Sequence, residues 1–172
     1  MSLPDAVDHL RAALGQLGLS GDPELDRTPE RFAELLSEFS PQPVPPCPPL
    51  PTRSHTPVVV RELRFHSLCA HHLLPFFGHC TIAYRPAGAI AGLGWFPRAL
   101  DALARRPQLQ ERLAQDLADA VFGALTPHSV LVWVSARQMC VEMRGSRATA
   151  TFEVSAAAGA PDPELLALVR GR

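Results

Sequence analysis

Apolar residues spaced three and four positions apart predict two helices near the start of the chain. The first begins after Ser2 and runs to about Gly18, with leucines along one side. The second begins where Thr28 precedes Pro29, because threonine is a good N-cap and proline suits the first helical position. Apolar residues at 32, 35, 36 and 39 give this second helix one amphipathic face. Prolines dominate residues 41–57, which indicates an extended linker rather than a packed element.

From residue 58 onward, strand-like and helix-like segments alternate in pairs. In chain order, we predict strands at 58–69 and 78–85, helices at 97–106 and 108–125, strands at 129–136 and 147–156, and a short helix capped by Asp162. This order predicts an α+β domain, with an antiparallel β-sheet and helices packed on one face. The chain therefore divides into N-terminal helices with a Pro-rich linker at 1–57 and a larger domain at 58–172.

Composition is that of an ordered globular protein and argues against two classes of partner. Of the 172 residues 47% are hydrophobic and 19% charged, which suits a chain with a buried core. The net charge of −1 creates no overall field that attracts nucleic acid or an acidic membrane surface. All basic residues are arginine, so arginine, backbone amides or hydroxyls must hold any anionic substrate. Four cysteines without a disulfide pattern, and no signal-peptide pattern or long apolar run, predict a cytoplasmic protein.

The segment Cys69-Ala70-His71-His72 carries the most informative chemistry, because it offers thiolate and imidazole groups at short spacing. Such ligands suit zinc, and a catalytic zinc has three protein ligands and one open position. Cys69 and one of the two histidines supply two ligands, and Cys140 is the best-placed candidate for the third. The alternative is that the cysteines are buried as small hydrophobic residues and that the histidines are structural.

Several separate segments resemble the GTP cyclohydrolase I family in order and spacing. They are Asp26–Ala33, Phe65–Pro86, Gly92-Leu93, Arg105–Leu113 and Met139–Gly145. The resemblance covers most of the chain from residue 26 to about 154. It implies the tunnelling fold, in which the sheets of neighbouring subunits join into a barrel. It also implies a homo-oligomer of stacked rings with active sites between subunits, and a GTP cyclohydrolase I-like catalytic domain at 58–172.

The resemblance implies a specific reaction and a metal site. The reaction opens the guanine imidazole ring of GTP, releases formate and forms 7,8-dihydroneopterin triphosphate. Carried over by position, Cys69, His72 and Cys140 bind Zn²⁺, which lowers the pKa of bound water to about 7. His71 is then the acid/base that protonates the purine, a role that suits imidazole near neutral pH. The alternative for His71 is that it only orients a neighbouring group.

The resemblance also implies the substrate-binding residues. Glu111, preceded by Gln110, falls where the family binds the guanine edge. Arg98, Arg144 and Arg31 match positions that hold the triphosphate, and Arg31 is expected to reach over from a neighbouring subunit. The alternative reading makes Glu111 and each arginine an ordinary surface charge.

Three positions depart from the family pattern. Ala70 replaces a glutamate, and Trp95 replaces a lysine. Gln138 stands in the position of a catalytic histidine, and its carboxamide cannot exchange a proton at neutral pH. If another residue takes over this proton transfer, His66 and His79 are the first candidates.

These departures leave alternatives open beside the full reaction. A divergent homologue would stop at a ring-opened formamidopyrimidine or act on another purine nucleotide. A non-catalytic paralogue would use zinc for stability and bind a purine or pterin. A nucleobase deaminase is disfavoured, because its His-x-Glu and Pro-Cys-x-x-Cys elements are absent from the sequence.

Overall fold

The computed structural model describes residues 2–169, which form two compact units. The first unit extends to Ser40, and the second begins at Pro41. None of the helices in residues 2–169 has the length and apolar character needed to span a bilayer.

The N-terminal unit is a helical hairpin. It contains α1 (Leu3–Gln16), the 3₁₀ helix η1 (Pro23–Leu25) and α2 (Thr28–Glu38). Ser2 caps α1 in a reciprocal box, in which the Asp5 amide donates to Ser2 Oγ and the Ser2 amide donates to Asp5 Oδ2. The predicted start of the second helix is wrong by one residue. The N-cap of α2 is Arg27, and Thr28 is already helical.

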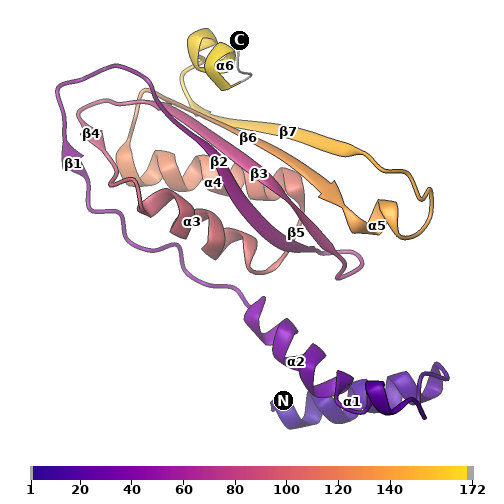
Figure 1. Cartoon of the computed structure of the whole chain (residues 1–172). Coiled ribbons are helices and arrows are strands. Elements are labelled where there is room, and N and C mark those ends of the chain that lie inside the picture. Colours follow the sequence, from indigo (N-terminus) through magenta and orange to yellow (C-terminus); the bar gives the residue numbers. More distant parts are fainter. Residues whose placement is uncertain (1, 170–172) are drawn as a thin grey trace. The chain divides into compact units, whose positions relative to one another are not determined.

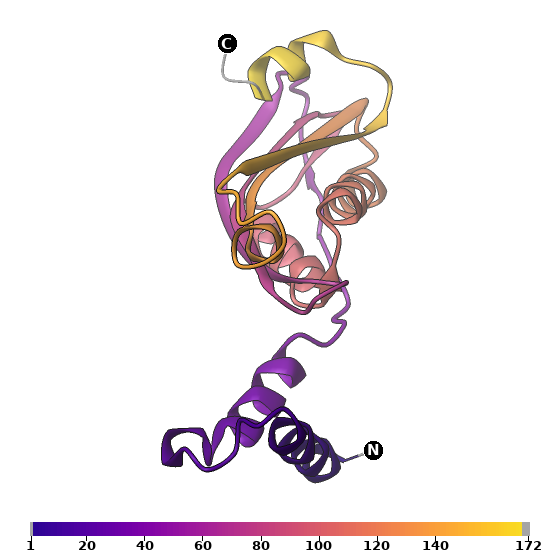
Figure 2. The same cartoon turned by 90° about the vertical axis from the view of Figure 1, so that its right-hand side faces the viewer.

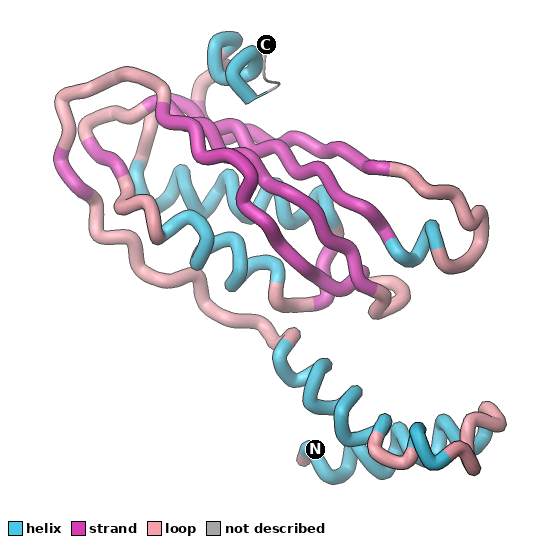
Figure 3. Tube along the Cα trace, viewed as in Figure 1, coloured by secondary structure: helices cyan, strands magenta, loops and turns pink. Residues whose placement is uncertain are grey.

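The larger unit contains a curled sheet and the remaining helices (Figure 1). Its elements are β1 (Leu50–Pro51), β2 (Val58–Cys69), β3 (Pro75–Arg85), β4 (Ala89–Ile90), α3 (Trp95–Ala104), β5 (Pro107–Gln108), α4 (Gln110–Leu125), β6 (Ser129–Gln138), α5 (Met139–Glu142), β7 (Thr151–Gly159) and α6 (Pro163–Val169). The main sheet has the order β5-β2-β3-β6-β7 (Figure 3). All neighbours pair antiparallel except β5, which pairs parallel with β2.

Alternating side chains give the two faces of the sheet different roles. On one face, residues such as Ile82 and Val132 join the main core with α3 and α4, which lie together on that side (Figure 2). On the opposite face, Ala83, Leu131 and Trp133 pack against α6. The predicted α+β architecture is confirmed, and α6 additionally covers part of the second face.

The close approach of β3 and β6 requires glycine at position 78. A Cβ atom at Gly78 would lie 2.0 Å from the Ser135 carbonyl oxygen and 2.7 Å from Ala136 Cα. No side chain fits there, because both neighbouring atoms belong to the backbone of a paired strand. Gly78 therefore permits the pairing that joins the two halves of the sheet.

The proline-rich segment is packed on the larger unit, so the prediction of an unpacked linker is wrong. Val44 and Cys47 contact the main core, and Trp95 Nε1 donates to the Pro45 carbonyl at 2.9 Å. Further along, β1 pairs with β4. Proline has no amide proton, but its carbonyl accepts normally, which is how this segment bonds to the domain.

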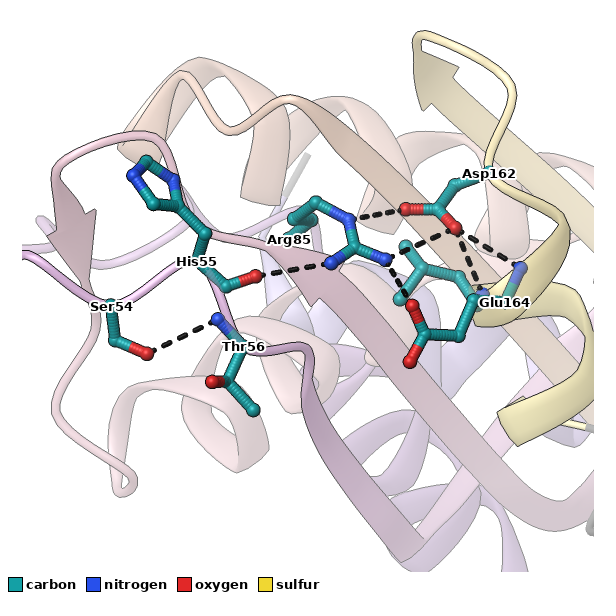
Figure 4. A network of polar contacts seen from close by, with 7 residues as sticks. Ser54, His55, Thr56, Arg85, Asp162 and Glu164 are labelled. Carbon is teal, nitrogen blue, oxygen red and sulfur yellow. Dashed lines mark hydrogen bonds and ion pairs between the residues drawn. The ribbon is translucent and has the colours of Figure 1, made fainter.

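An arginine at the end of β3 anchors the C-terminal helix (Figure 4). Arg85 Nε donates to Asp162 Oδ2 at 2.6 Å, and its Nη2 donates to Glu164 Oε2 at 2.7 Å. Its Nη1 donates to the His55 carbonyl at 3.1 Å. The backbone amides of Glu164 and Leu165 donate to Asp162 Oδ1, which confirms the predicted cap. The hydrogen bond from Arg85, more than the amides, lowers the pKa of the Asp162 carboxyl group.

Asp162→Asn is expected to lower Tm by roughly 2–4 °C at neutral pH, because it keeps the cap but removes the charge that faces Arg85. The folded-state pKa of Asp162 is lowered, so its contribution is present above its unfolded pKa, about 4, and is lost as pH falls through the folded value. The Tm difference should therefore be constant from about pH 5 to 7 and narrow below about pH 4. Thermal melts at a series of pH values measure this Tm difference.

Asp101→Asn, which breaks an exposed ion pair with Arg105, is the control and should change Tm little. A pH-independent difference would contradict the role of the charge.

Candidate metal centre

Three potential metal ligands converge at one end of the sheet. Cys69 is the last residue of β2, His72 lies in the following turn, and Cys140 lies in α5. One ligand atom from each residue lies within 4.8 Å of the others, and Cys69 Sγ is 3.8 Å from His72 Nδ1. The structure therefore brings together the three residues that the sequence predicted as ligands.

The turn after β2 is held by backbone hydrogen bonds that fix the first two ligands. The Cys69 carbonyl accepts from the amides of His72 at 3.3 Å and Leu73 at 2.8 Å, and the Cys69 amide donates to the Leu74 carbonyl. Leu73 adopts a φ of 53°, which reverses the chain toward β3. On the other side, the Ala70 amide donates to the Gln108 carbonyl of β5. Cys69 is thus held from two directions, and His71 and His72 project from a fixed turn.

The third ligand lies in a single helical turn directly after β6. This turn, α5, is braced by the ion pair between Arg137 and Glu142. Burial raises the pKa of the Cys140 thiol, and the neighbouring sulfur of Cys69 raises it further. A cation bound between the two sulfurs would offset this effect and stabilise the thiolate form. The donor set of two thiols and one imidazole fits zinc with one coordination position left for water or substrate.

An open pocket of about 350 Å³ lies beside the ligand cluster. Its wall is formed by Cys69, His71, Gln108, Leu109, Gln110, Glu111, Gln138, Cys140, Val141, Phe152, Glu153 and Val154. Two of the candidate ligands, Cys69 and Cys140, thus share a pocket with four other predicted site residues: His71, Gln110, Glu111 and Gln138. The wall combines titratable, amide and apolar groups, as ligand-binding pockets do.

Two carboxamides in this wall form a hydrogen-bonded chain. Gln110 Nε2 donates to the Val134 carbonyl at 3.1 Å and to the Phe152 carbonyl at 2.8 Å. Gln138 Nε2 donates to Gln110 Oε1 at 2.9 Å, and Gln138 Oε1 lies 3.9 Å from Cys140 Sγ. Gln138 therefore connects the buried interior to the ligand cluster.

The predicted phosphate-binding arginines do not line this pocket. Arg98 is exposed on α3, and Arg144 is exposed just after α5. Arg31 is exposed on α2, in the N-terminal unit. Their role in holding a triphosphate stays a prediction.

The two histidines suggested as replacements for a proton-transfer group do not join the pocket. His66 stacks on Phe77 with ring centroids 5.9 Å apart, and His79 Nε2 lies 3.7 Å from Glu62 Oε2. Strand alternation places His66 and His79 on the face opposite the core residues Phe65 and Cys80. Within a single chain, neither histidine therefore lies on the face of the sheet that carries Cys69.

Part of the pocket wall was missed in the sequence. Phe152, Glu153 and Val154 come from β7, and Gln108 comes from the two-residue strand β5. The alternation of residues along β7 predicts a strand. The same pattern does not predict which end of β7 lies beside the ligand cluster. That information lies in the register of β7 on β6, where Ala136 pairs with Phe152.

Comparison with known proteins identifies one matching family. Residues 6–162 match the protein family described as GTP cyclohydrolase I. The chain belongs to the GTP cyclohydrolase I family. The resemblance inferred from the sequence motifs is confirmed, and the protein is an enzyme of the GTP cyclohydrolase I type.

Similar proteins cover nearly the whole chain. GTP cyclohydrolase 1 of Leifsonia xyli subsp. xyli is 39% identical over 181 residues, which span 95% of this chain and 92% of that protein. GTP cyclohydrolase 1 of Bacillus subtilis is 36% identical over 161 residues, spanning 90% of this chain and 84% of that protein. The crystal structure of the archaeosine synthase QueF-Like in the apo form aligns with a TM-score of 0.54 and 25% identity. The alignment covers 64% of this chain and 100% of the QueF-Like chain. This likeness supports the predicted tunnelling fold.

Removal of one sulfur ligand tests the metal centre. Cys140→Ala is expected to lower bound divalent metal from about one ion per chain to a small fraction, because two remaining ligands hold zinc weakly. Elemental analysis after dialysis against zinc measures it. Cys47→Ala, which removes a half-buried thiol outside the cluster, is the matched control and should keep full occupancy. Full occupancy in Cys140→Ala would show that the cluster is not the metal site.

Proposed function

We propose that this protein is a zinc-dependent hydrolase that opens the guanine imidazole ring of GTP, releases formate and forms 7,8-dihydroneopterin triphosphate. One observation carries the proposal. Cys69, His72 and Cys140 form a cluster with the composition of a catalytic zinc site, and its two sulfur residues share a pocket wall with Glu111. A metal centre and a group suited to binding a guanine edge are both needed for this reaction, and membership of the family supports their pairing.

Zinc supplies Lewis-acid chemistry when bound, by lowering the pKa of water toward about 7. The residues of the chain supply the rest. His71 lies in the pocket wall next to the ligand His72, where its imidazole donates a proton to a purine nitrogen as the ring opens. Glu111 accepts hydrogen bonds from N1 and the exocyclic amine of guanine, which adenine cannot provide in that arrangement. Gln110 stands beside Glu111 in the same wall.

The triphosphate is proposed to lie outside the pocket described for one chain. Arg98 and Arg144 are exposed, and guanidinium groups bind phosphate oxygens in forked pairs. Arg31 is proposed to come from a neighbouring subunit in a homo-oligomer of stacked rings. Such an assembly also pairs the open edges of the sheet, which lie at β7 and at the part of β2 that β5 leaves unpaired. We place the enzyme in the cytoplasm.

Incubation of zinc-loaded protein with GTP, followed by mass spectrometry, tests the reaction and the role of Glu111 together. The unmodified protein is expected to release formate and a dihydropterin triphosphate. Glu111→Ala should raise KM for GTP and lower kcat, with kcat/KM falling roughly 10- to 100-fold, because guanine's donors lose a charged acceptor. Asp119→Ala, at an exposed site on the same helix, is the control. Equal binding of adenine and guanine nucleotides by the unmodified protein would contradict the role of Glu111.

The chemistry of Gln138 favours a second outcome of the reaction, in which turnover is incomplete. Its carboxamide bonds to Gln110 and faces Cys140, and it has no group that titrates near neutral pH. Ring opening needs one proton donor, which His71 provides. Formate release and ribose rearrangement need further proton transfers. We therefore propose slow turnover in which a formylated, ring-opened intermediate accumulates.

Gln138→His tests this second outcome. The substitution is expected to raise the rate at which the ring-opened intermediate becomes pterin by about ten-fold or more, because imidazole adds a proton-transfer group. Quenched-flow samples analysed by mass spectrometry give both rates. His79→Gln, on the opposite face of the sheet, is the control and should leave both rates unchanged. Rapid pterin formation by the unmodified protein without an intermediate would refute the proposed block.

A further inference from the structure

The carboxamide of Gln110 is fixed in one orientation by its surroundings. The side chain belongs to a residue only 4% exposed, at the first turn of α4. Two backbone carbonyl oxygens, of Val134 on β6 and Phe152 on β7, lie at hydrogen-bond distance from one end of this amide. Carbonyl oxygens accept only, so the end that faces them must be the NH₂ group. The opposite end is therefore the oxygen, Oε1.

The orientation of Gln110 determines that of Gln138. Gln110 Oε1 accepts, so the nearby atom of Gln138, at 2.9 Å, must be the donor Nε2. A reversed Gln138 would place two amide oxygens against each other. A joint reversal of both amides would place Gln110 Oε1 against two buried carbonyl oxygens, with no donor among them. The oxygen of Gln138 is thus directed toward Cys140 Sγ, 3.9 Å away.

We infer that Gln110 is a positioning residue, which holds Gln138 so that Oε1 accepts a hydrogen bond from the water molecule that attacks the substrate. The inference rests on the proposed function, since it concerns the same pocket. Both carboxamides line this pocket together with Cys69 and Cys140. As a metal ligand, the Cys140 sulfur carries no proton, so Gln138 Oε1 is left to accept from a donor in the pocket.

This arrangement explains how glutamine and histidine can occupy the same position. A histidine at this position would donate one ring N–H to Gln110 Oε1 and direct its other nitrogen, an acceptor, to the pocket. Gln138 reproduces the orienting part of that role through Nε2 and Oε1. It does not reproduce proton uptake, because an amide oxygen is a very weak base. Gln110 Oε1 therefore accepts a hydrogen bond from the residue at position 138 and orients it, whether that residue is glutamine or histidine.

A double-mutant cycle tests the coupling between the two carboxamides. Gln110→Met and Gln138→Met keep side-chain length and remove the amide. Each is expected to lower kcat for GTP loss about ten-fold, the size of one lost hydrogen bond, with little change in KM. The double variant should be no slower than either single variant, because both changes remove the same contact. Gln115→Met, at an exposed position on the same helix, is the control.

A spectroscopic measurement on the cobalt-substituted protein separates positioning from general destabilisation. The thiolate charge-transfer bands should persist in both single variants, because the ligands are untouched. The d–d bands, which respond to the open coordination position, should shift by the same amount in both variants. Gln110→Asn, which keeps the amide but shortens it, provides the same test if the methionine variant does not assemble.

Each result decides the inference. Multiplicative losses in the double variant, or cobalt spectra of the Gln110 variants identical to those of the unmodified protein, would show that Gln110 is only structural. If the unmodified protein does not consume GTP but the two variants shift the cobalt spectrum equally, the positioning role stands and the proposed substrate is wrong. If GTP is consumed and the spectra do not shift, the positioning role alone fails.

Discussion

The pairing of β3 with both β2 and β6 is the constraint on which the site depends. Leu68 pairs with Pro75 on one side of β3, and Phe76 pairs with Gln138 on the other. The end of β2 and the end of β6 therefore lie at the same end of the sheet, which brings Cys69 and Cys140 together although they are far apart in sequence. A slip of one residue would turn Cys69 away from the core face and separate the sulfurs.

Most of the fold could be predicted from periodicity. The strand at 58–69 was predicted with the bounds that β2 has, because its ends carry clear strand and turn signals. The strands β1, β4 and β5 were missed because two-residue pairings have no period to detect, and α5 is a single turn. The packing of the segment after residue 41 was also missed. Proline marks an extended backbone, but it does not reveal what that backbone lies against.

The candidate site also has features that the sequence predicts and features that only the structure reveals. The convergence of Cys69, His72 and Cys140 was predictable, because thiolate and imidazole groups at the family's spacing suit a shared metal site. The bond between Gln138 and Gln110 was not, since it joins side chains 28 residues apart whose orientation depends on the carbonyls of β6 and β7. Sequence alone showed that Gln138 cannot transfer a proton. Only the geometry shows which of its atoms faces the pocket, and so what it can still do.

The four cysteines differ in ways that extend beyond metal binding. Complete burial raises the pKa of the Cys80 thiol to about 12, so essentially none of it is thiolate at neutral pH. Burial also raises the pKa of the Cys47 thiol, which slows its reaction. Alkylating reagents act on thiolates, and a bound cation occupies the sulfurs of Cys69 and Cys140. Alkylation of Cys69 and Cys140 in the native protein is therefore expected to rise with the fraction of chains whose ligand cluster holds no metal.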